Sequence, residues 1–163
     1  MKLRFLQNKD AVFMLEWMHD PSVVRFMKTD FLTKTADDCL TFIKASQDTT
    51  DDLHLAITDD KDEYMGTVSL KHITHGSAEF GIVIRKIAMG KGYSQFGMDS
   101  IIETGVKHHG ISKIYWCVDP INERALSFYD RQGYVRCDVP EEAYGYSEEE
   151  KKKFVWYSID GMK

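Results

Sequence analysis

A glycine-rich turn between a strand-like run and a helical pattern is the feature that most constrains how this chain folds. Residues 80–84 are mostly apolar, Gly90-Lys91-Gly92 follows, and from Gln95 onward apolar residues recur at helical spacing. Glycines leave the backbone N–H groups of such a turn uncovered, and a helix N-terminus favours negative charge. The pattern predicts a strand, a turn and a helix, with a phosphate-like anion against residues 91–94. Gly-x-Gly alone is also compatible with an ordinary strand-to-helix turn.

A second motif lies further along the chain, over residues 122–132. Ala125, Phe128 and Tyr129 share one face of a predicted helix, Asn122 can cap its N-terminus, and Gly133 can end it. The inward phenol of Tyr129 has two interpretations: a catalytic group, or an aromatic core residue beside Phe128.

In this order and spacing, the two motifs resemble those of the GNAT superfamily of acyl-CoA-dependent N-acetyltransferases. Residues 17–21, Trp-Met-His-Asp-Pro, look like its ribosomal-protein and polyamine acetyltransferase-like branch. The resemblance is close over residues 79–110 and 115–134 and looser elsewhere. It implies transfer of acetyl from acetyl-CoA to a primary amine by direct attack, without a metal. One position departs from the family pattern: Ile87 stands where Gln or Arg is usual, and Arg85 and Lys86 are the nearest charges.

Periodicity along the chain predicts a series of strands and helices. Strands are expected at residues 2–7, 53–57, 65–73, 78–85, 111–118, 134–139 and 153–159. Helices are expected from Asn8 to about residue 20 (Val12, Leu15 and Met18 on one face), over 35–46 (Cys39, Phe42 and Ile43 inward), over 95–110 and over 122–132. This order is that of the GNAT fold, an α/β (α+β type) arrangement of about four helices on a mixed, mostly antiparallel, seven-stranded sheet. The resemblance implies a central parallel pair, strands 78–85 and 111–118, that splays apart and admits the pantetheine arm of acetyl-CoA.

The resemblance also assigns the residues that contact the co-substrate, at the end of one strand, in the glycine loop and on the second helix. They are Val83, Ile84, Arg85, Gly90, Lys91, Gly92, Tyr93, Ser94, Asn122 and Tyr129.

Tyr129 is the predicted catalytic acid. A phenol with a pKa of about 10 is protonated at neutral pH and can donate to the thiolate that leaves the thioester. Full transfer to a thiolate whose conjugate acid has a pKa of about 8.5 is uphill by about 2 kcal/mol, so the phenol assists departure and does not drive it.

Glu79 is the predicted residue on the amine side, because it matches an acidic position of the branch and shares a strand face with the small Gly81. A carboxylate there can hold the ammonium or pass its proton on through water. A strand glutamate that faces solvent or pairs with a lysine or arginine is the alternative. His72 and His75 are rival bases.

Two segments are expected to surround the acceptor. The first lies between residues 17 and 35, and the second between residues 144 and 157, where aromatic rings offer flat faces. A small-molecule amine, such as a polyamine or an amino sugar on a nucleotide carrier, is the favoured acceptor, and a protein N-terminus is the alternative. A non-catalytic acyl-CoA-binding module is the rival function; Tyr129 favours an enzyme. The acidic side chains of the first segment are Asp20, Asp30, Asp37 and Asp38, and the aromatic ones of the second are Tyr144, Tyr146, Trp156 and Tyr157.

Composition sets the remaining limits. The length of 163 residues suits one domain, residues 1–163, and a net charge of −5 argues against nucleic acid as the main partner. Residues 151–153, three lysines after three glutamates, are expected to form a solvated turn. Cys39, Cys117 and Cys137 lack metal or disulfide spacing and indicate reduced thiols. No signal peptide or membrane span is expected, so a cytoplasmic protein is favoured, and a homodimer is the candidate oligomeric state.

Overall fold

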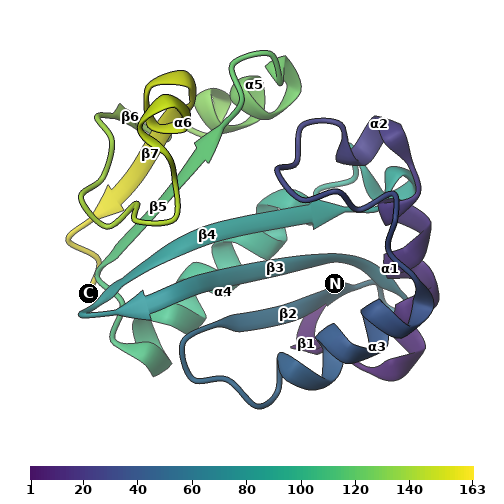
Figure 1. Ribbon diagram of the computed structural model, residues 1–163. Coiled ribbons are helices and arrows are strands. Elements are labelled where there is room, and N and C mark those ends of the chain that lie inside the picture. Colours follow the sequence, from purple (N-terminus) through teal and green to yellow (C-terminus); the bar gives the residue numbers. More distant parts are fainter.

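The computed structural model describes residues 1–163 as one mixed sheet with helices on both faces (Figure 1). The strands are β1 (Lys2–Phe5), β2 (Leu53–Thr58), β3 (Tyr64–Thr74), β4 (Ser77–Ile84), β5 (Lys113–Val118), β6 (Arg136–Cys137) and β7 (Val155–Asp160). The helices are α1 (Ala11–Met18), α2 (Pro21–Val24), α3 (Ala36–Ala45), α4 (Tyr93–His109), α5 (Glu123–Arg131) and α6 (Glu148–Lys153), with short 3-10 turns η1 (Asn8–Asp10) and η2 (Lys86–Ala88).

The seven strands lie in the order β1-β2-β3-β4-β5-β7-β6, and only the β4–β5 pair is parallel. That pair is joined at three positions, which end at Glu79 opposite Tyr115. Beyond this point β4 runs on to Ile84 and β5 to Val118 without pairing to each other, and Figure 1 shows the two strands diverging. The predicted fold class and the splayed central pair are therefore confirmed, with six helices in place of about four because α2 and α6 were not predicted.

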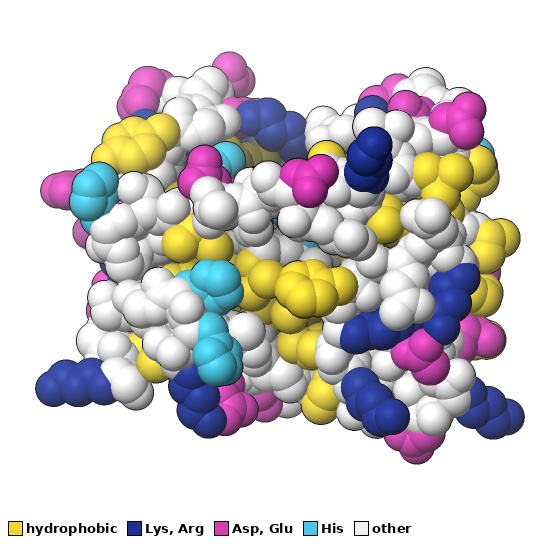
Figure 2. Space-filling view, turned by 90° about the horizontal axis from the view of Figure 1, so that it is seen from below, with side chains coloured by type: hydrophobic (Ala, Val, Ile, Leu, Met, Phe, Trp, Pro, Cys, Tyr) yellow, Lys and Arg dark blue, Asp and Glu magenta, His cyan; other side chains and the backbone are white.

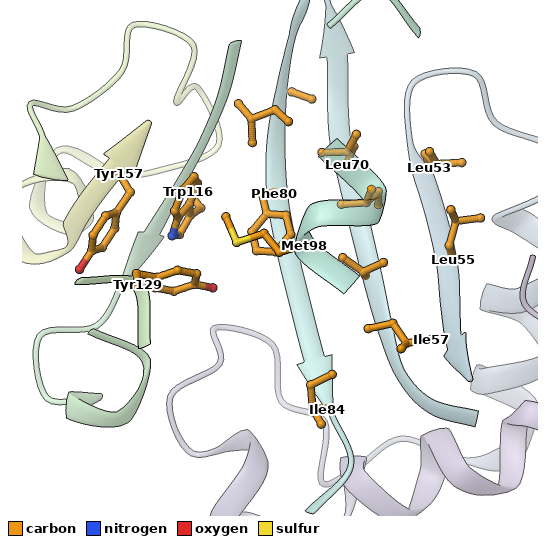
Figure 3. Packing of buried hydrophobic residues seen from close by; sticks show 14 of the residues in the cluster. Leu53, Leu55, Ile57, Leu70, Phe80, Ile84, Met98, Trp116, Tyr129 and Tyr157 are labelled. Carbon is orange, nitrogen blue, oxygen red and sulfur yellow. The ribbon is translucent and has the colours of Figure 1, made fainter. Parts of the chain in front are cut away.

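One face of the sheet is covered by α4, as the helical spacing predicted. Met98 and Ile101 are fully buried against Phe80, Leu70 and other side chains of the larger core (Figure 3). The helix approaches β2 closely because residue 97 is glycine: a Cβ there would lie 2.4 Å from Cδ1 of Ile57. Because Gly97 lies in the second turn of α4, this contact holds the N-terminal end of the helix close to the sheet.

The other face is covered by α1 and α3, and here two predicted side-chain orientations are wrong. Val12 is 65% exposed, because the 3-10 turn η1 precedes α1 and changes its phase, so that Met14 and Trp17 point inward. Helix α3 begins after Thr35 and buries Cys39 and Ile43 as expected. Phe42 is 37% exposed at the rim, and its ring contacts that of His54 edge-on at 4.9 Å.

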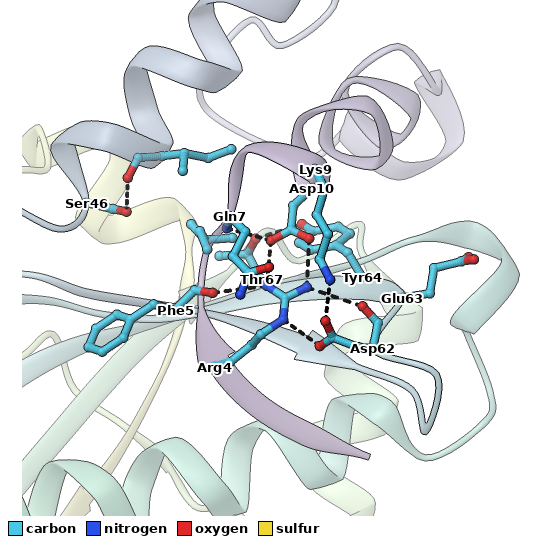
Figure 4. A network of polar contacts seen from close by, with 12 residues as sticks. Arg4, Phe5, Gln7, Lys9, Asp10, Ser46, Asp62, Glu63, Tyr64 and Thr67 are labelled. Atoms are coloured by element: carbon cyan, nitrogen blue, oxygen red, sulfur yellow. Dashed lines mark hydrogen bonds and ion pairs between the residues drawn. The ribbon is translucent and has the colours of Figure 1, made fainter.

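An ion-pair network fixes the N-terminal edge strand (Figure 4). The guanidinium of Arg4 donates to both carboxylate oxygens of Asp10, at 2.7 and 2.9 Å, and through Nε to Asp62 at 2.7 Å. Asp10 is buried, and it also accepts from the backbone N–H of Gln7. The network ties β1 and η1 to the turn between β2 and β3.

Several elements of the structure differ from the sequence predictions. Residues 151–153 are not a turn: they end helix α6, which Ser147 caps together with Glu150. Glutamates at the N-terminus and lysines at the C-terminus both complement the helix dipole, which explains the helix. Asp20 caps the short helix α2, and the strand expected over 134–139 contracts to Arg136–Cys137.

The outer surface carries no concentrated charge in the view of Figure 2, where acidic and basic side chains are interspersed. None of the helices is both long enough and apolar enough to cross a membrane. No three histidine, cysteine, aspartate or glutamate side chains are grouped so that they could hold a metal ion.

Candidate functional site

The site lies where β4 and β5 separate. The last residues paired between these two strands are Glu79 and Tyr115. Beyond them β4 is paired only to β3, and it leads through Val83 and Ile84 to the loop before α4. Side chains of the two sheet faces therefore meet at this gap from opposite sides: Glu79 from the face away from α4, and Tyr129 of α5 from the face that α4 covers.

The glycine loop has the backbone geometry that an anion requires. Gly90 and Gly92 have φ values of 73° and 87°, a left-handed conformation that favours glycine, and a Cβ at Gly90 would meet no atom within 4 Å. The backbone N–H groups of Tyr93, Ser94 and Gln95, the first residues of α4, donate to no carbonyl of the chain. Three free donors at the positive end of a long helix form a cradle that fits a pyrophosphate.

Arg85, predicted to contact the co-substrate, is turned away from this cradle. Its buried guanidinium donates to both carboxylate oxygens of Glu16 at 3.0 and 2.9 Å, to Glu63 at 2.8 Å and to the carbonyl of Tyr64 at 2.9 Å. It also stacks on the ring of Phe13. With these partners Arg85 anchors the end of β4 to α1, and it has no free donor group aimed at the loop.

Two arginines that the sequence interpretation did not select lie beside the open end of the gap. A hollow of about 280 Å³ lies between the end of α2 and the start of α5. Nη1 of Arg124 approaches Sδ of Met89, in the glycine loop, to 2.9 Å. Arg124 stands two residues after the cap Asn122, which is the only sequence signal that pointed to it. The side chain of Ile87 is 59% exposed and does not cover the glycine loop before α4. The hollow is lined by Arg25, Phe26, Ile121, Asn122, Glu123 and Arg124.

Asn122 caps α5, as predicted, by accepting the backbone N–H of Ala125 at 3.2 Å. The helix thereby directs Tyr129 into an aromatic cluster with Trp116, 5.2 Å away between ring centroids, and Tyr157, 5.4 Å away. Figure 3 shows the Tyr129 hydroxyl pointing away from Tyr157, toward β4.

The environment of Tyr129 is apolar and incompletely hydrogen-bonded. The side chain is 6% exposed, and this burial raises the pKa of its hydroxyl well above the ordinary value of 10, with no hydrogen bond to offset it. The buried Nε1 of Trp116 also has no acceptor within the chain. Two polar groups without protein partners beside the gap are consistent with a ligand that enters there.

Glu79 is buried on the opposite face, with only 7% of its side chain exposed. The hydroxyl of Tyr146 donates to its Oε1 at 2.5 Å, Nζ of Lys71 lies 3.3 Å from the same atom, and Nε2 of His72 lies 3.6 Å from Oε2. The space expected beside Gly81 is occupied by Lys71, whose Cε would lie 3.5 Å from a Cβ at that position. The predicted solvent-facing alternative is thus wrong, and the lysine-paired one describes the structure.

Of the other candidate bases and nucleophiles, His75 lies in the exposed hairpin turn after β3 and bonds only to Thr74. Cys117, on β5, lies against Tyr146 near Glu79. Burial raises the pKa of the Cys117 thiol to about 11, so that it stays protonated at neutral pH. It is a poor nucleophile for an acyl-enzyme.

The two segments predicted to surround the acceptor, residues 17–35 and 144–157, contact each other near the gap. Nζ of Lys28, in the loop after α2, binds the carbonyl of Gly145 at 3.2 Å and Glu150 at 3.1 Å, and lies 5.1 Å from the Tyr146 ring centroid. Tyr144 is 81% exposed. The ring of Trp156 supports that of Tyr146 edge-on, 5.0 Å away.

The other residues predicted in these two segments contact the core or the backbone. Tyr157 belongs to the α4 face, because its ring stacks on Trp116 and its hydroxyl donates to Asp130. Asp20 caps α2, and Asp38, in the first turn of α3, completes the capping box by accepting from the backbone N–H of Thr35. Asp30 accepts from the backbone N–H of Leu32, and Asp37 is exposed in the first turn of α3.

Comparisons with known proteins agree with this geometry. The family described as acetyltransferase (GNAT) domain matches residues 1–135, a range that includes both motifs and ends before Tyr146. No protein with a curated description matches the sequence.

Solved structures match over nearly the whole chain. The spermidine N-acetyltransferase from Vibrio cholerae in complex with CoA and spermine superposes with a TM-score of 0.80 at 20% identity, over 98% of this chain and 95% of that one. A dodecameric structure of a spermidine N-acetyltransferase from the same organism gives 0.73 at 20% identity, over 98% and 92%. The Campylobacter jejuni N-acetyltransferase PseH gives 0.68 at 18%, over 98% and 96%. At these identities the structures show a shared fold, and it is the family match that identifies the chain: it belongs to the acetyltransferase (GNAT) domain family, whose members use acetyl-CoA as co-substrate.

Proposed function

We propose that the chain transfers the acetyl group of acetyl-CoA to a primary amine of a small molecule by direct attack. The observation that carries the proposal is the gap between β4 and β5, with the phenol of Tyr129 on one face and the carboxylate of Glu79 on the other. A thioester carbonyl in that gap is accessible to an amine on the Glu79 side, while its sulfur lies on the Tyr129 side.

On the co-substrate side, the free N–H groups of Tyr93 and Ser94 would hold the pyrophosphate, beside Gly90, Lys91 and Gly92. Arg124 of α5 takes the role expected of the residue at position 87. Val83, Ile84 and Asn122 border the path from the loop into the gap. Arg85 is not included in this proposal, because its donors are engaged by Glu16 and Glu63.

The step at the thioester needs a partner for the sulfur as the C–S bond breaks. The phenol of Tyr129 is protonated, and a thiol with a pKa of about 8.5 holds its proton less tightly than a phenol. Because burial raises the pKa of Tyr129 further, its O–H stabilises the developing thiolate by a hydrogen bond, and the proton on sulfur comes finally from the amine.

On the acceptor side, Glu79 is a positioning residue. A carboxylate is a far weaker base than an alkylamine, so it does not deprotonate the substrate ammonium in one step. The buried carboxylate of Glu79, fixed by the hydroxyl of Tyr146, instead holds the ammonium at the gap until the proton leaves through water.

A polyamine is the acceptor class with most support. The anionic Glu79 suits a cation, and one solved structure with the same fold is a spermidine N-acetyltransferase in complex with CoA and spermine. The contact of Lys28 with Gly145 and Glu150 narrows the approach, which favours a slender amine over a folded protein.

The test is an acceptor screen that measures thiol release from acetyl-CoA with spermidine, spermine, amino sugars, nucleotide-linked amino sugars and peptides with free N-termini. We expect release with at least one polyamine, and release slowed between about tenfold and a thousandfold when Tyr129→Phe replaces the wild type at matched concentration. Tight CoA binding by calorimetry without thiol release from any amine would instead identify a non-catalytic binding module.

A further inference from the structure

We infer that Lys71 is an internal acceptor, and that the enzyme acetylates Nζ of Lys71 when no amine substrate is present. The inference rests on the proposed function, because it uses the same thioester and the same gap. It assigns a modification site to a lysine that would otherwise be only one half of an ion pair.

The position of Lys71 follows from the register of β3 and β4. Lys71 lies directly opposite Glu79, the last residue of β4 that pairs with β5. Its Nζ is 3.3 Å from the carboxylate that, in the proposed function, holds the substrate ammonium. A primary amine of the protein therefore stands where the acceptor amine is required.

Gly81 allows this lysine to lie along the gap and not away from it. The Cε and Nζ atoms of Lys71 come within 3.5 and 3.9 Å of the place where a Cβ of Gly81 would be. Gly81 lies beyond the last position at which β4 pairs with β5, so this part of the Lys71 side chain is already beside the gap. The Lys71 side chain is 36% exposed, which leaves it room to change rotamer and reach a carbonyl between the strands.

Other lysines near the site are engaged elsewhere. Lys28 is held by Gly145 and Glu150 above the gap. Lys113 pairs with Glu142 at the closed end of the β4–β5 contact. Lys71 is the one lysine that contacts Glu79.

The reaction balances without a further reagent. The lysine first loses a proton to water, and the neutral Nζ attacks the thioester carbonyl of acetyl-CoA. A C–N bond forms and the C–S bond breaks, with its electron pair leaving on sulfur. The remaining extra proton on nitrogen passes through water to the thiolate, so the products are Nε-acetyl-lysine and the free thiol of CoA.

Acetylation of Lys71 has a consequence for the site. The amide is neutral, so Glu79 loses its cationic partner and keeps only the hydrogen bond from Tyr146 and the contact with His72. The added acetyl group also occupies the space in which an acceptor amine would lie. The modified enzyme therefore loses acceptor turnover, and an amine substrate protects against the modification.

The experiment incubates the full-length protein with acetyl-CoA alone and follows acetylation of each lysine by peptide mass spectrometry. Lys107, which is 62% exposed on α4, reports on non-enzymatic acetylation by the thioester. We expect Lys71 to react at least about tenfold faster than Lys107, as expected for an amine held near its electrophile. Tyr129→Phe should slow acetylation at Lys71 and leave Lys107 unaffected.

Lys71→Arg provides the matched variant, since arginine keeps the positive charge opposite Glu79 and accepts no acetyl group under these conditions. Wild type preincubated with acetyl-CoA should lose acceptor turnover in parallel with Lys71 acetylation. Lys71→Arg should show no such time-dependent loss, whatever its starting rate.

The outcomes separate this inference from the proposed function. Acceptor-dependent thiol release with Lys71 acetylated no faster than Lys107, or equally fast in Tyr129→Phe, overturns the inference and leaves the proposed function standing. Rapid Lys71 acetylation without thiol release in response to any added amine supports the inference and overturns the proposal of a small-molecule amine acceptor. If neither acceptor-dependent thiol release nor Lys71 acetylation is observed, both the inference and the proposed function are overturned.

Discussion

Replacing Tyr129 by phenylalanine separates the catalytic interpretation of this residue from the structural one. The substitution removes a single oxygen atom and keeps the ring in contact with Trp116 and Tyr157. If Tyr129 only fills the core, turnover should not change. If its hydroxyl stabilises the leaving thiolate, turnover should fall while the fold is unaffected.

The expected magnitudes follow from the surroundings of the hydroxyl. Loss of a hydrogen bond to a developing charge should lower kcat between about tenfold and a thousandfold, equivalent to about 1.4–4 kcal/mol in the activation barrier. The hydroxyl forms no hydrogen bond within the chain, so its removal should change the free energy of unfolding by less than about 1 kcal/mol.

Three measurements are needed on the same preparation: kcat with a confirmed acceptor, CoA affinity by calorimetry, and urea unfolding. Tyr134→Phe is the matched control, because Tyr134 belongs to the same aromatic cluster, with its ring centroid 6.2 Å from that of Tyr129. We expect unchanged CoA affinity in both variants and a large loss of kcat only in Tyr129→Phe.

The pH dependence adds a further check. Burial raises the pKa of Tyr129 above its ordinary value of 10, so the phenol stays protonated throughout the neutral and mildly alkaline range. Any alkaline limb of kcat below pH 10 must therefore persist in Tyr129→Phe. An unchanged kcat in this variant, or an equal loss in Tyr134→Phe, would refute the assignment of Tyr129 as the group that acts on sulfur.

Four further predictions concern other parts of the molecule. Gly92→Glu adds a carboxylate and backbone strain at a φ of 87°, and calorimetry should show CoA binding nearly abolished, with less loss in Gly92→Ala. Glu79→Gln should lower kcat/KM for the acceptor and shift the acidic limb of its pH profile, with KM for acetyl-CoA nearly constant; a change confined to acetyl-CoA would contradict its position on the amine side. Asp10→Asn leaves the charge of Arg4 poorly compensated and should cost about 3 kcal/mol in urea unfolding, and a loss below about 1 kcal/mol would show that Asp62 suffices. Burial lowers the pKa of His54 below its ordinary 6.5, so its contribution to stability is present above pH 6.5 and is lost as pH falls through the folded-state pKa. In His54→Gln the free energy of unfolding should therefore differ less between pH 8 and pH 5 than it does in the wild type. An unchanged difference would assign the acid sensitivity to other groups.

Features encoded within a few neighbouring residues could be predicted from the sequence. The turn at Gly90 and Gly92 follows from two glycines between a strand-like run and a helical one, and the cap at Asn122 follows from its place before an amphipathic run. The splayed pair of strands came from the resemblance to a known family and not from periodicity, since nothing in the residues of β4 shows where its pairing ends.

Contacts between distant residues could not be predicted in this way. Glu79 receives its hydrogen bond from a residue 67 positions away, and Arg85 is bound by one 69 positions away. The sequence places Arg85 close to the glycine loop, but only the packing of α1 against β4 shows that it turns toward Glu16. On α1 only Val12 was misplaced, for a local reason: the 3-10 turn η1 precedes it, whereas Met18 is buried as predicted.

The short contact between β4 and β5 has a consequence for how the protein opens. Backbone hydrogen bonds that cross from β1–β4 to β5–β7 are concentrated at one end, near Gly76, Glu79 and residues 112–115. Strands β1–β4 and strands β5–β7 can therefore open locally as separate cooperative units, with different free energies of local opening. In hydrogen exchange we expect the amides of β5 and β7 to lose protection together, and independently of those in β2 and β3. A ligand wedged between the halves should join them and slow exchange in both.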